Sequence, residues 1–263
     1  MKKYSILGSD NRNLKLKELY IQEGNIIQSS YKDADVIIGP TPFSKDDIKV
    51  NGDTIKCDDL IESMKFSNKV LYAGSISNNL KAKLRNENIK YVDLLEFEEL
   101  AILNAIPTAE GAIMEAISGT DITIHSSNCL VLGYGRIGKV LSKMLDGMGA
   151  NVFCEARKKK DIAMIDCMGY NSVEIEKIDE YINKMDIIFN TVPFMLLDKN
   201  RIDNLKPGVL VVDLASVPGG IDFSYAKEKN INVKWALAIP GKVAPLTAAK
   251  YYKEIIDRIE GGN

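Results

Sequence analysis

Three glycines, Gly133, Gly135 and Gly138, have the types and spacing that could bind a nucleotide. They follow the apolar run 129–132 and precede a stretch with helical periodicity that ends near Gly149. In this arrangement the first glycine permits a tight turn, the second lets a pyrophosphate approach the backbone, and the third lets helix and strand pack closely. The helix N-terminus adds free N–H groups for phosphates. The segment therefore predicts a dinucleotide site; the alternative is a glycine-rich turn without a ligand.

The residues after the second strand of this region bear on which dinucleotide binds. NAD sites usually carry an acid near the end of that strand. Alignment places Ala156 at that position, and Arg157 with the lysines that begin at Lys158 could pair with a 2′-phosphate. Glu155 comes one residue early, and neighbouring strand residues face opposite sides. We therefore predict NADP, with NAD as the alternative.

Three later loops follow predicted strands of the same region, at 190–193, 213–220 and 240–245. Strand ends of one parallel sheet meet at one edge, so these loops are expected to line one crevice, unless they are mere connections. The predicted cofactor-binding residues are Gly133, Tyr134, Gly135, Arg136, Ile137, Gly138, Ala156, Arg157, Lys158, Asn190, Thr191, Val192, Pro193, Ala215, Pro240 and Gly241.

Short β-branched runs alternate with longer amphipathic stretches along the whole chain, which is typical of βαβ units. Segments 35–42 and 186–193 resemble each other, since each is an apolar run that leads into a proline-containing loop. This repetition favours two similar domains over chance. The predicted fold is α/β, with two Rossmann-like domains of parallel sheets, a connecting helix and a C-terminal crossover helix.

The predicted domain boundaries follow from these elements. An N-terminal α/β substrate domain is expected at 1–106 and a connecting helix at 107–120, because Pro107 suits a first helical turn. A dinucleotide-binding domain is expected at 121–242. A C-terminal helix at 243–263 is expected to pack back on the first domain.

Composition narrows the classes of function. The 263 residues carry 34 Lys and Arg against 36 Asp and Glu, which argues against nucleic acid as the main partner. No apolar run approaches the roughly 20 residues of a membrane span, so no membrane association is expected. The four cysteines are scattered and the metal-ligand spacings are absent, so we expect a reduced, cytoplasmic protein without a bound metal.

Several segments together resemble the family of dipicolinate synthase A chains. They are 104–113, 131–138, 213–220 and 240–245, with 39–43 in the first domain, and the resemblance runs from about residue 4 to 256. It implies oxidation of a dihydrodipicolinate-type intermediate to the pyridine dicarboxylate of bacterial spores, with NAD(P), in a branch of the lysine pathway. It also implies a flavoprotein-like partner, the B chain of dipicolinate synthase, in a homo- or hetero-oligomer, and the mother-cell cytoplasm of a sporulating bacterium as location. Glu155 and the lysines after Arg157 depart from the family pattern.

The implied reaction needs cations or N–H groups for two carboxylates, a ring held against the nicotinamide, and a proton acceptor. The candidate substrate-binding residues are Arg12, Thr41, Thr108, Ser216 and Lys242. Lys242 is the first choice for a carboxylate partner and, with Glu110 as candidate proton acceptor, forms the predicted catalytic pair. Each charge could instead lie on the surface or cap a helix.

Two other functions remain open from the sequence. The chain could be another amino-acid or keto-acid dehydrogenase, because 213–220 and 240–245 are also similar to loops of alanine dehydrogenases and transhydrogenases. The only histidine, His125, precedes the first cofactor-domain strand, at the edge away from the ligand, and alanine dehydrogenases use a histidine near the substrate. The chain could also be a nucleotide-sensing module without catalysis.

Overall fold

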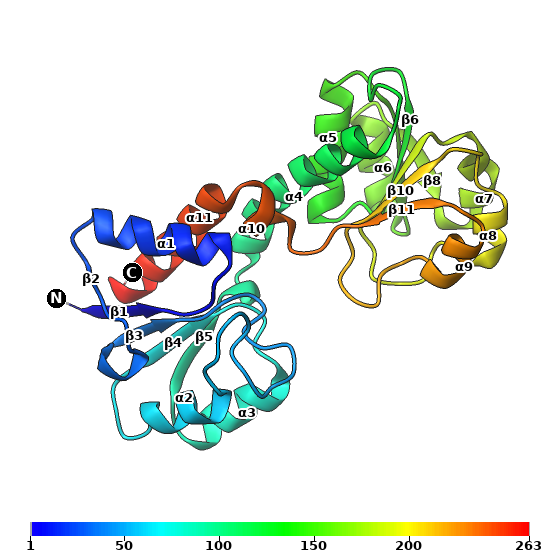
Figure 1. The fold of residues 1–263 in the computed structure, drawn as a ribbon. Helices are drawn as coiled ribbons and strands as arrows, with labels where there is room; N and C mark the ends of the chain where they lie inside the picture. The colour runs from blue at the N-terminus through cyan, green and yellow to red at the C-terminus, as the bar shows by residue number, and fades with distance from the viewer. Residues whose placement is uncertain (1, 263) are drawn as a thin grey trace. The chain divides into compact units, whose positions relative to one another are not determined.

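The computed structural model describes residues 2–262, which form two compact units. Unit 1 contains the chain up to Asn104 and again from Pro240 onward, and unit 2 is Ala105–Ile239. Each unit is a parallel β-sheet with helices, as Figure 1 shows, so the predicted α/β class is confirmed. The second domain had been predicted to extend to residue 242, whereas unit 2 ends at Ile239.

Unit 1 is built on a five-stranded sheet in the order β2-β1-β3-β4-β5, and all its strand pairs are parallel. Its elements are β1 (Lys3–Ile6), α1 (Asn11–Gln22), β2 (Ile26–Ile27), β3 (Val36–Ile38), α2 (Cys57–Met64), β4 (Val70–Ala73), α3 (Asn78–Asn86), β5 (Lys90–Asp93) and, from the end of the chain, α11 (Pro245–Glu260).

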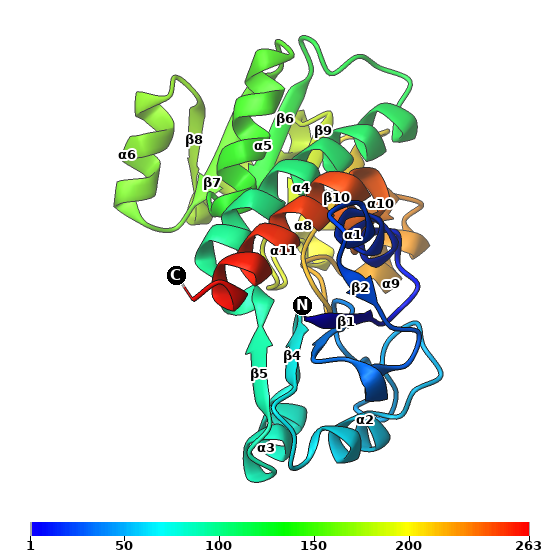
Figure 2. The ribbon, with the colours of Figure 1, turned by 90° about the vertical axis from the view of Figure 1, so that its left-hand side faces the viewer.

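Alternation along the strands divides the interior of unit 1 into two layers. In β3, Ile37 joins the apolar cluster under α2 and α3, whereas Val36 and Ile38 join the cluster under α1 and α11. Successive strand residues face opposite sides of a sheet, so one apolar run fills both cores. Figure 2 shows the same unit from the side, with α1 and α11 next to each other.

Unit 2 is built on a six-stranded parallel sheet in the order β11-β10-β9-β6-β7-β8. This is the order of a doubly wound dinucleotide-binding sheet, in which β6 is the first strand and the order in which strands are added reverses between β6 and β9. Its elements are β6 (Asn128–Leu132), α5 (Arg136–Gly147), β7 (Asn151–Ala156), α6 (Lys159–Cys167), β8 (Asn171–Glu174), α7 (Ile178–Tyr181), β9 (Ile187–Asn190), α8 (Lys199–Asp203), β10 (Leu210–Asp213), α9 (Phe223–Glu228) and β11 (Asn232–Trp235).

Two helices join the units in sequence: α4 (Glu98–Gly119) and α10 (Ile239–Val243). The connecting helix was predicted to begin at Pro107, but α4 begins at Glu98 and Pro107 lies inside it. Proline lacks the N–H that would bond to the carbonyl one turn back, which is why it signalled a helix start. The apolar residues before Pro107 continue the helix, and Leu100 and Ala105 among them are buried.

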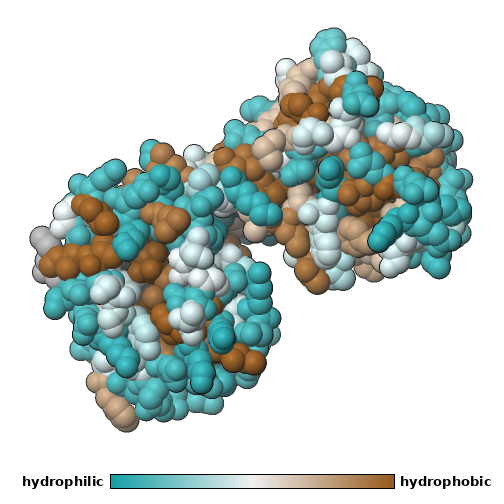
Figure 3. Space-filling model, in the orientation of Figure 1, coloured by the Kyte–Doolittle hydropathy of each residue, from teal (hydrophilic) through white to brown (hydrophobic). Residues whose placement is uncertain are grey.

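Helix α4 also corrects the expectation that no apolar segment has the length of a membrane span. By length and composition it qualifies as a candidate, although half of its most apolar stretch is buried inside the protein. Core helices of folded domains meet the same criterion. Figure 3 shows hydrophobic side chains in small groups among hydrophilic ones on the visible face of each unit.

Candidate functional site

The glycine loop of unit 2 connects β6 to α5 and requires glycine at two positions. Gly133 has φ +92°, and a Cβ there would lie 2.6 Å from Val192 Cγ2. A Cβ on Gly138 would lie 2.0 Å from the carbonyl oxygen of Gly133. At Gly135 a Cβ would meet nothing within 4 Å, so this side of the loop is open. The loop is therefore closed toward the sheet and open toward a ligand.

The start of α5 fits the phosphates of a dinucleotide. Gly135 is its N-cap, and no side chain caps its N–H groups. Gly135 and Arg136 are exposed and Ile137 is half-buried, whereas Tyr134 is buried and burial raises its pKa to about 12. Uncapped N–H groups at the N-terminus of a twelve-residue helix favour an anion. The residues present thus fit the diphosphate of a nicotinamide cofactor.

Glu155, at the end of β7, lies under this loop and was not among the predicted site residues. Its Oε2 accepts a hydrogen bond from Gly133 N at 3.0 Å, and the residue is 2% exposed. Its buried Oε1 has no partner among the described residues, and burial raises the pKa of the carboxyl group. The acid spaced about 20 residues from a glycine loop is a known sequence signal, and it points to Glu155.

The residues that follow Glu155 were predicted to bind the cofactor from their place in the alignment. Their side chains differ in exposure. Ala156, predicted at the position of the acid, is 5% exposed, whereas Arg157 and Lys158 are exposed. Lys159 forms an ion pair with Glu174 at 2.8 Å. Arg157 and Lys158 are therefore accessible to a phosphate at this strand end, as is the exposed Lys160.

Two buried side chains join the loops that follow β9 and β10. Asp213 Oδ1 accepts hydrogen bonds from Asn190 Nδ2 and Ala215 N, both at 2.9 Å, and its Oδ2 accepts one from Gly220 N at 2.8 Å. The Asn190 amide also bonds to the backbone of Val192 in both directions. Asn190 and Asp213 are 0% exposed. The side chain of Asn190, a predicted cofactor ligand, is thus used to hold the loops.

The remaining predicted residues of these loops are accessible to different degrees. Thr191 Oγ1 donates to the Leu132 carbonyl at 2.9 Å, which ties this loop to the end of β6. Pro193 and Ser216 are exposed, whereas Ala215 is buried and its carbonyl accepts a hydrogen bond from Trp235 Nε1 at 3.1 Å. Strands β6, β9 and β10 are neighbours in one sheet, so these loops share its carboxyl edge.

In unit 1 the structure brings two of the predicted substrate residues together. Arg12 Nη2 forms an ion pair with Asp10 Oδ2 at 3.0 Å, and Arg12 Nη1 donates to the Tyr252 hydroxyl at 3.3 Å. The Tyr252 hydroxyl lies 3.1 Å from Thr41 Oγ1. Thr41 packs against Gly74, where a Cβ would lie 2.0 Å from Oγ1. Sequence reasoning missed Tyr252, because an aromatic residue on an amphipathic helix is typical of a core position.

The other predicted substrate and catalytic residues are distributed over both units. Lys242, in α10, is exposed and belongs to unit 1, where a Cβ on the preceding Gly241 would lie 3.9 Å from Arg12 Cβ. Thr108 is buried and Glu110 is exposed, and both belong to unit 2. The group in unit 1 therefore contains Arg12 and Thr41 with their partners Asp10 and Tyr252, and the exposed Lys242 follows Gly241 beside Arg12.

Comparison with known proteins identifies the part of the chain that contains the glycine loop. Residues 108–217 match the family model of the D-isomer specific 2-hydroxyacid dehydrogenase NAD-binding domain. The chain is 37% identical over 190 residues to the A chain of dipicolinate synthase from Bacillus subtilis (strain 168), and the match covers 72% of this chain. It covers 64% of that relative, somewhat less than two thirds of its length.

Solved structures extend the similarity over the whole chain. The crystal structure of the dipicolinate synthase A chain from Bacillus halodurans superposes with a TM-score of 0.89 at 28% identity, and covers 100% of this chain and 98% of that one. The crystal structure of the A chain from Bacillus subtilis gives a TM-score of 0.86 at 29% identity, with 99% and 96% covered.

The NAD-binding domain and its glycine loop define an NAD(P)-dependent oxidoreductase with a dehydrogenase fold. Within that class, sequence and structure agree on one group of relatives. The chain is similar over nearly its whole length to dipicolinate synthase A chains.

Proposed function

We propose that the chain is the dehydrogenase component of a dipicolinate synthase, which oxidises a dihydropyridine dicarboxylate to dipicolinate during sporulation. The relationship to dipicolinate synthase A chains is the observation that carries this proposal. The substrate loses a hydride and a proton, and its ring becomes aromatic, so neither a metal nor a covalent nucleophile is needed. When bound, the oxidised nicotinamide supplies the hydride acceptor.

The residues of unit 1 are proposed to bind the two carboxylates. Arg12 is permanently charged and Lys242 is exposed, so each offers a cation to a carboxylate oxygen. Thr41 adds a hydroxyl group to the same cluster. Because Arg12 is only 7% exposed, its guanidinium group needs a small displacement of the surrounding side chains to meet a substrate.

The residues of unit 2 are proposed to bind the cofactor and to accept the proton. The N-terminus of α5 holds the diphosphate, and the loops joined by Asn190 and Asp213 flank the nicotinamide half of the site. Glu110 is exposed and its carboxylate can take the proton, and Thr108 and Ser216 add hydroxyl groups. Glu110 thus acts as general base in this proposal, and Lys242 orients the substrate.

The direct test is a coupled assay of the purified chain. A dihydrodipicolinate-type precursor is generated in place by the preceding enzyme of the lysine pathway, and reduced nicotinamide and dipicolinate are both measured. The two products are expected in equal amounts with the wild-type chain, and Lys242→Ala is expected to lower kcat/KM by about 100-fold, as for loss of a charged substrate contact. Absence of both products, with and without the flavoprotein-like B chain of dipicolinate synthase, would refute the proposal.

The preferred cofactor is proposed to be NADP, held at its 2′-phosphate by Arg157 and Lys158. Arg157→Ala is expected to weaken NADP binding about tenfold, or about 1.4 kcal/mol, and to leave NAD binding unchanged. Lys159→Ala is the matched control, because that ammonium group is already paired with Glu174. Calorimetric titration measures both dissociation constants; equal losses for NADP and NAD would show that Arg157 does not recognise the 2′-phosphate.

The partner and location follow from the same similarity. We propose that the chain assembles with a flavoprotein-like partner, the B chain of dipicolinate synthase, and works in the cytoplasm of the mother cell. Co-purification of the two proteins from sporulating cells, compared with vegetative cells, tests both statements.

A further inference from the structure

Tyr252 lies at the centre of the unit 1 cluster. It is 1% exposed on α11, and the guanidinium carbon of Arg12 lies 4.5 Å from the centre of its ring. The Tyr252 hydroxyl oxygen accepts a hydrogen bond from Arg12 Nη1. A tyrosine ring face and hydroxyl group that meet the same guanidinium group restrict both its plane and its rotation.

The single proton of the Tyr252 hydroxyl group has one acceptor in this cluster. The Tyr252 and Thr41 hydroxyl oxygens lie 3.1 Å apart, so either can donate; because Arg12 Nη1 already donates to Tyr252, we assign the Tyr252 O–H to Thr41 Oγ1. The Thr41 hydroxyl then has its own proton left to donate, and residues 2–262 provide no further acceptor for it. Gly74 packs against Thr41 and fixes the position of its side chain.

Arg12 also keeps hydrogen-bonding capacity after these contacts. Its one ion-pair partner, Asp10, has a side chain that is 35% exposed, and the buried Arg12 Nε has no acceptor among the described residues. A buried guanidinium group with a donor unused favours a second anion, because an unpaired buried donor costs free energy. The cluster therefore contains an unused guanidinium donor and an unused hydroxyl proton.

We propose that Tyr252 is a positioning residue of a carboxylate subsite, in which it holds Arg12 and directs the Thr41 hydroxyl group toward one carboxylate of the substrate. This inference rests on the proposed function, because it assigns one substrate carboxylate to the cluster. It also gives α11 a role in substrate recognition beyond its part in the core of unit 1.

The test removes the hydroxyl group and keeps the ring. Tyr252→Phe leaves Arg12 Nη1 and Thr41 Oγ1 without their shared partner, and the matched control is Tyr251→Phe on the adjacent, half-buried tyrosine. The dissociation constant of pyridine-2,6-dicarboxylate and the KM of the dihydropyridine substrate are measured for both. Tyr252→Phe is expected to raise both about tenfold with kcat changed less than about threefold, and Tyr251→Phe is expected to change neither.

A second substitution separates positioning from a general structural role. Thr41→Val is expected to weaken dicarboxylate binding as Tyr252→Phe does, and Thr41→Ser is expected to restore it. The double variant Tyr252→Phe with Thr41→Val should bind the dicarboxylate about as tightly as the weaker-binding of the two single variants, because the two hydroxyl groups act through one hydrogen bond.

The outcomes distinguish the subsite from the proposed function. If the wild-type chain binds pyridine-2,6-dicarboxylate and Tyr252→Phe binds it equally well, the subsite is refuted and the proposed function stands. If Tyr252→Phe weakens cofactor binding as much as dicarboxylate binding, Tyr252 is merely structural and the subsite is refuted. If the wild-type chain binds cofactor but no dicarboxylate, the proposed function fails, and the subsite fails with it.

Discussion

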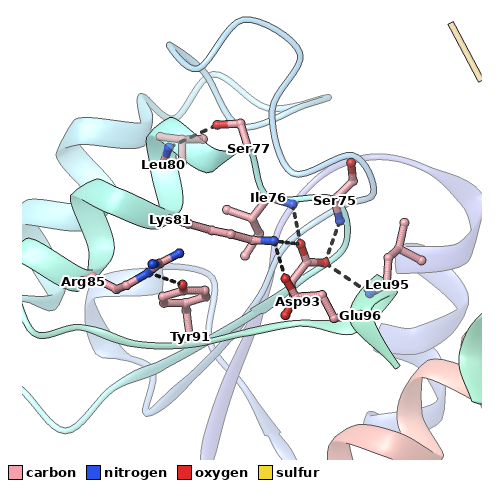
Figure 4. A network of polar contacts seen from close by, with 10 residues as sticks. All are labelled: Ser75, Ile76, Ser77, Leu80, Lys81, Arg85, Tyr91, Asp93, Leu95 and Glu96. Atoms are coloured by element: carbon pink, nitrogen blue, oxygen red, sulfur yellow. Dashed lines mark hydrogen bonds and ion pairs between the residues drawn. The ribbon is translucent and has the colours of Figure 1, made fainter. Parts of the chain in front are cut away.

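Each unit uses a buried aspartate at the end of a strand to hold the loops around it, but the two aspartates differ in their partners. Asp93, at the end of β5, accepts hydrogen bonds from the backbone of Ser75, Ile76 and Leu95, and pairs with Lys81 at 2.7 Å (Figure 4). Asp213, at the end of β10, is held by amide donors alone. A buried charge can thus be stabilised by an ammonium group or by fixed dipoles.

The same difference extends to the other buried charges. Among the described residues, unit 1 buries the cations Arg12, Lys81 and Lys253, whereas unit 2 buries the acids Glu155 and Asp213 without a buried cation. Lys81 and Lys253 each have two carboxylate partners, whereas Arg12 has one and its buried Nε has no acceptor among the described residues. The buried guanidinium group of unit 1 would therefore favour an anionic substrate. In unit 2 the buried acids lie beneath the backbone loops that are proposed to bind the cofactor.

The largest expected effect comes from removing the charge of Asp93. Asp93→Asn places an amide donor against Ile76 N–H or the Lys81 ammonium group and leaves a buried cation with Glu96 alone. Breaking a buried ion pair in this way should lower the free energy of unfolding by about 3–5 kcal/mol. Urea unfolding at neutral pH measures it, and Asp58→Asn, which breaks an exposed pair with Lys83, serves as the control. A loss no larger than that of the control would mean that the ion pair contributes little.

A smaller loss of stability, with a loss of cofactor binding, is expected at Asp213. Asp213→Asn keeps one oxygen acceptor but turns an amide donor toward Gly220 N–H or toward the Ala215 and Asn190 donors. One mismatched buried donor should cost about 2 kcal/mol, and the loosened loops should weaken cofactor binding about tenfold. Calorimetric titration of the cofactor checks this, with Asp93→Asn as a variant that should bind cofactor normally. Equal cofactor affinities in the two variants would erase the functional difference between the aspartates.

The smallest effect is expected at Glu155 and depends on pH. Burial raises its pKa above the ordinary value of 4.5, so the folded state retains a proton that the unfolded state has lost. Its contribution to stability therefore falls as pH rises above 4.5 and levels off beyond the folded pKa. Glu155→Gln keeps an acceptor for Gly133 N–H and has no charge to bury, so it should not lose stability as pH rises.

The measurement for Glu155 is the melting temperature as a function of pH. The gain of Glu155→Gln over the wild type should be absent below pH 4.5 and grow above it, whereas Glu180→Gln, on an exposed side chain of the same unit, should show no such gain. Loss of the Glu155 charge should also raise the affinity for NADP relative to NAD by roughly fivefold, because a carboxylate repels the 2′-phosphate. A gain that does not vary with pH would contradict a raised pKa.

Local patterns were sufficient to predict the two parallel sheets and the glycine loop, because apolar periodicity and glycine spacing are properties of adjacent residues. The short strands β2 and β8 were not predicted, since two to four residues carry little periodicity. The start of α4 was misplaced because a proline suggested a boundary that tertiary packing overrides. Strand ends were predicted well where apolar runs meet glycine or proline, but β7 continues to Ala156, beyond the end expected at Cys154.

The side-chain partners could be predicted much less well. The bond between Asn190 and Asp213 joins residues 23 positions apart on different strands, and the contact of Tyr252 with Arg12 spans 240 positions. No local pattern carries such pairs. The direction of Glu155 depends on where β7 ends, and a shift of one residue reverses the face on which a side chain lies.

The return of the chain to unit 1 at Pro240 has a consequence for its biosynthesis. On the ribosome, residues 105–239 emerge before α11, whose Tyr252, Ile255 and Ile256 complete one core of the first unit. The apolar face formed by Leu16, Val36 and other residues of that core must therefore remain uncovered while the second unit is translated. The nascent first unit is then a natural client for a holding chaperone until the last helix arrives.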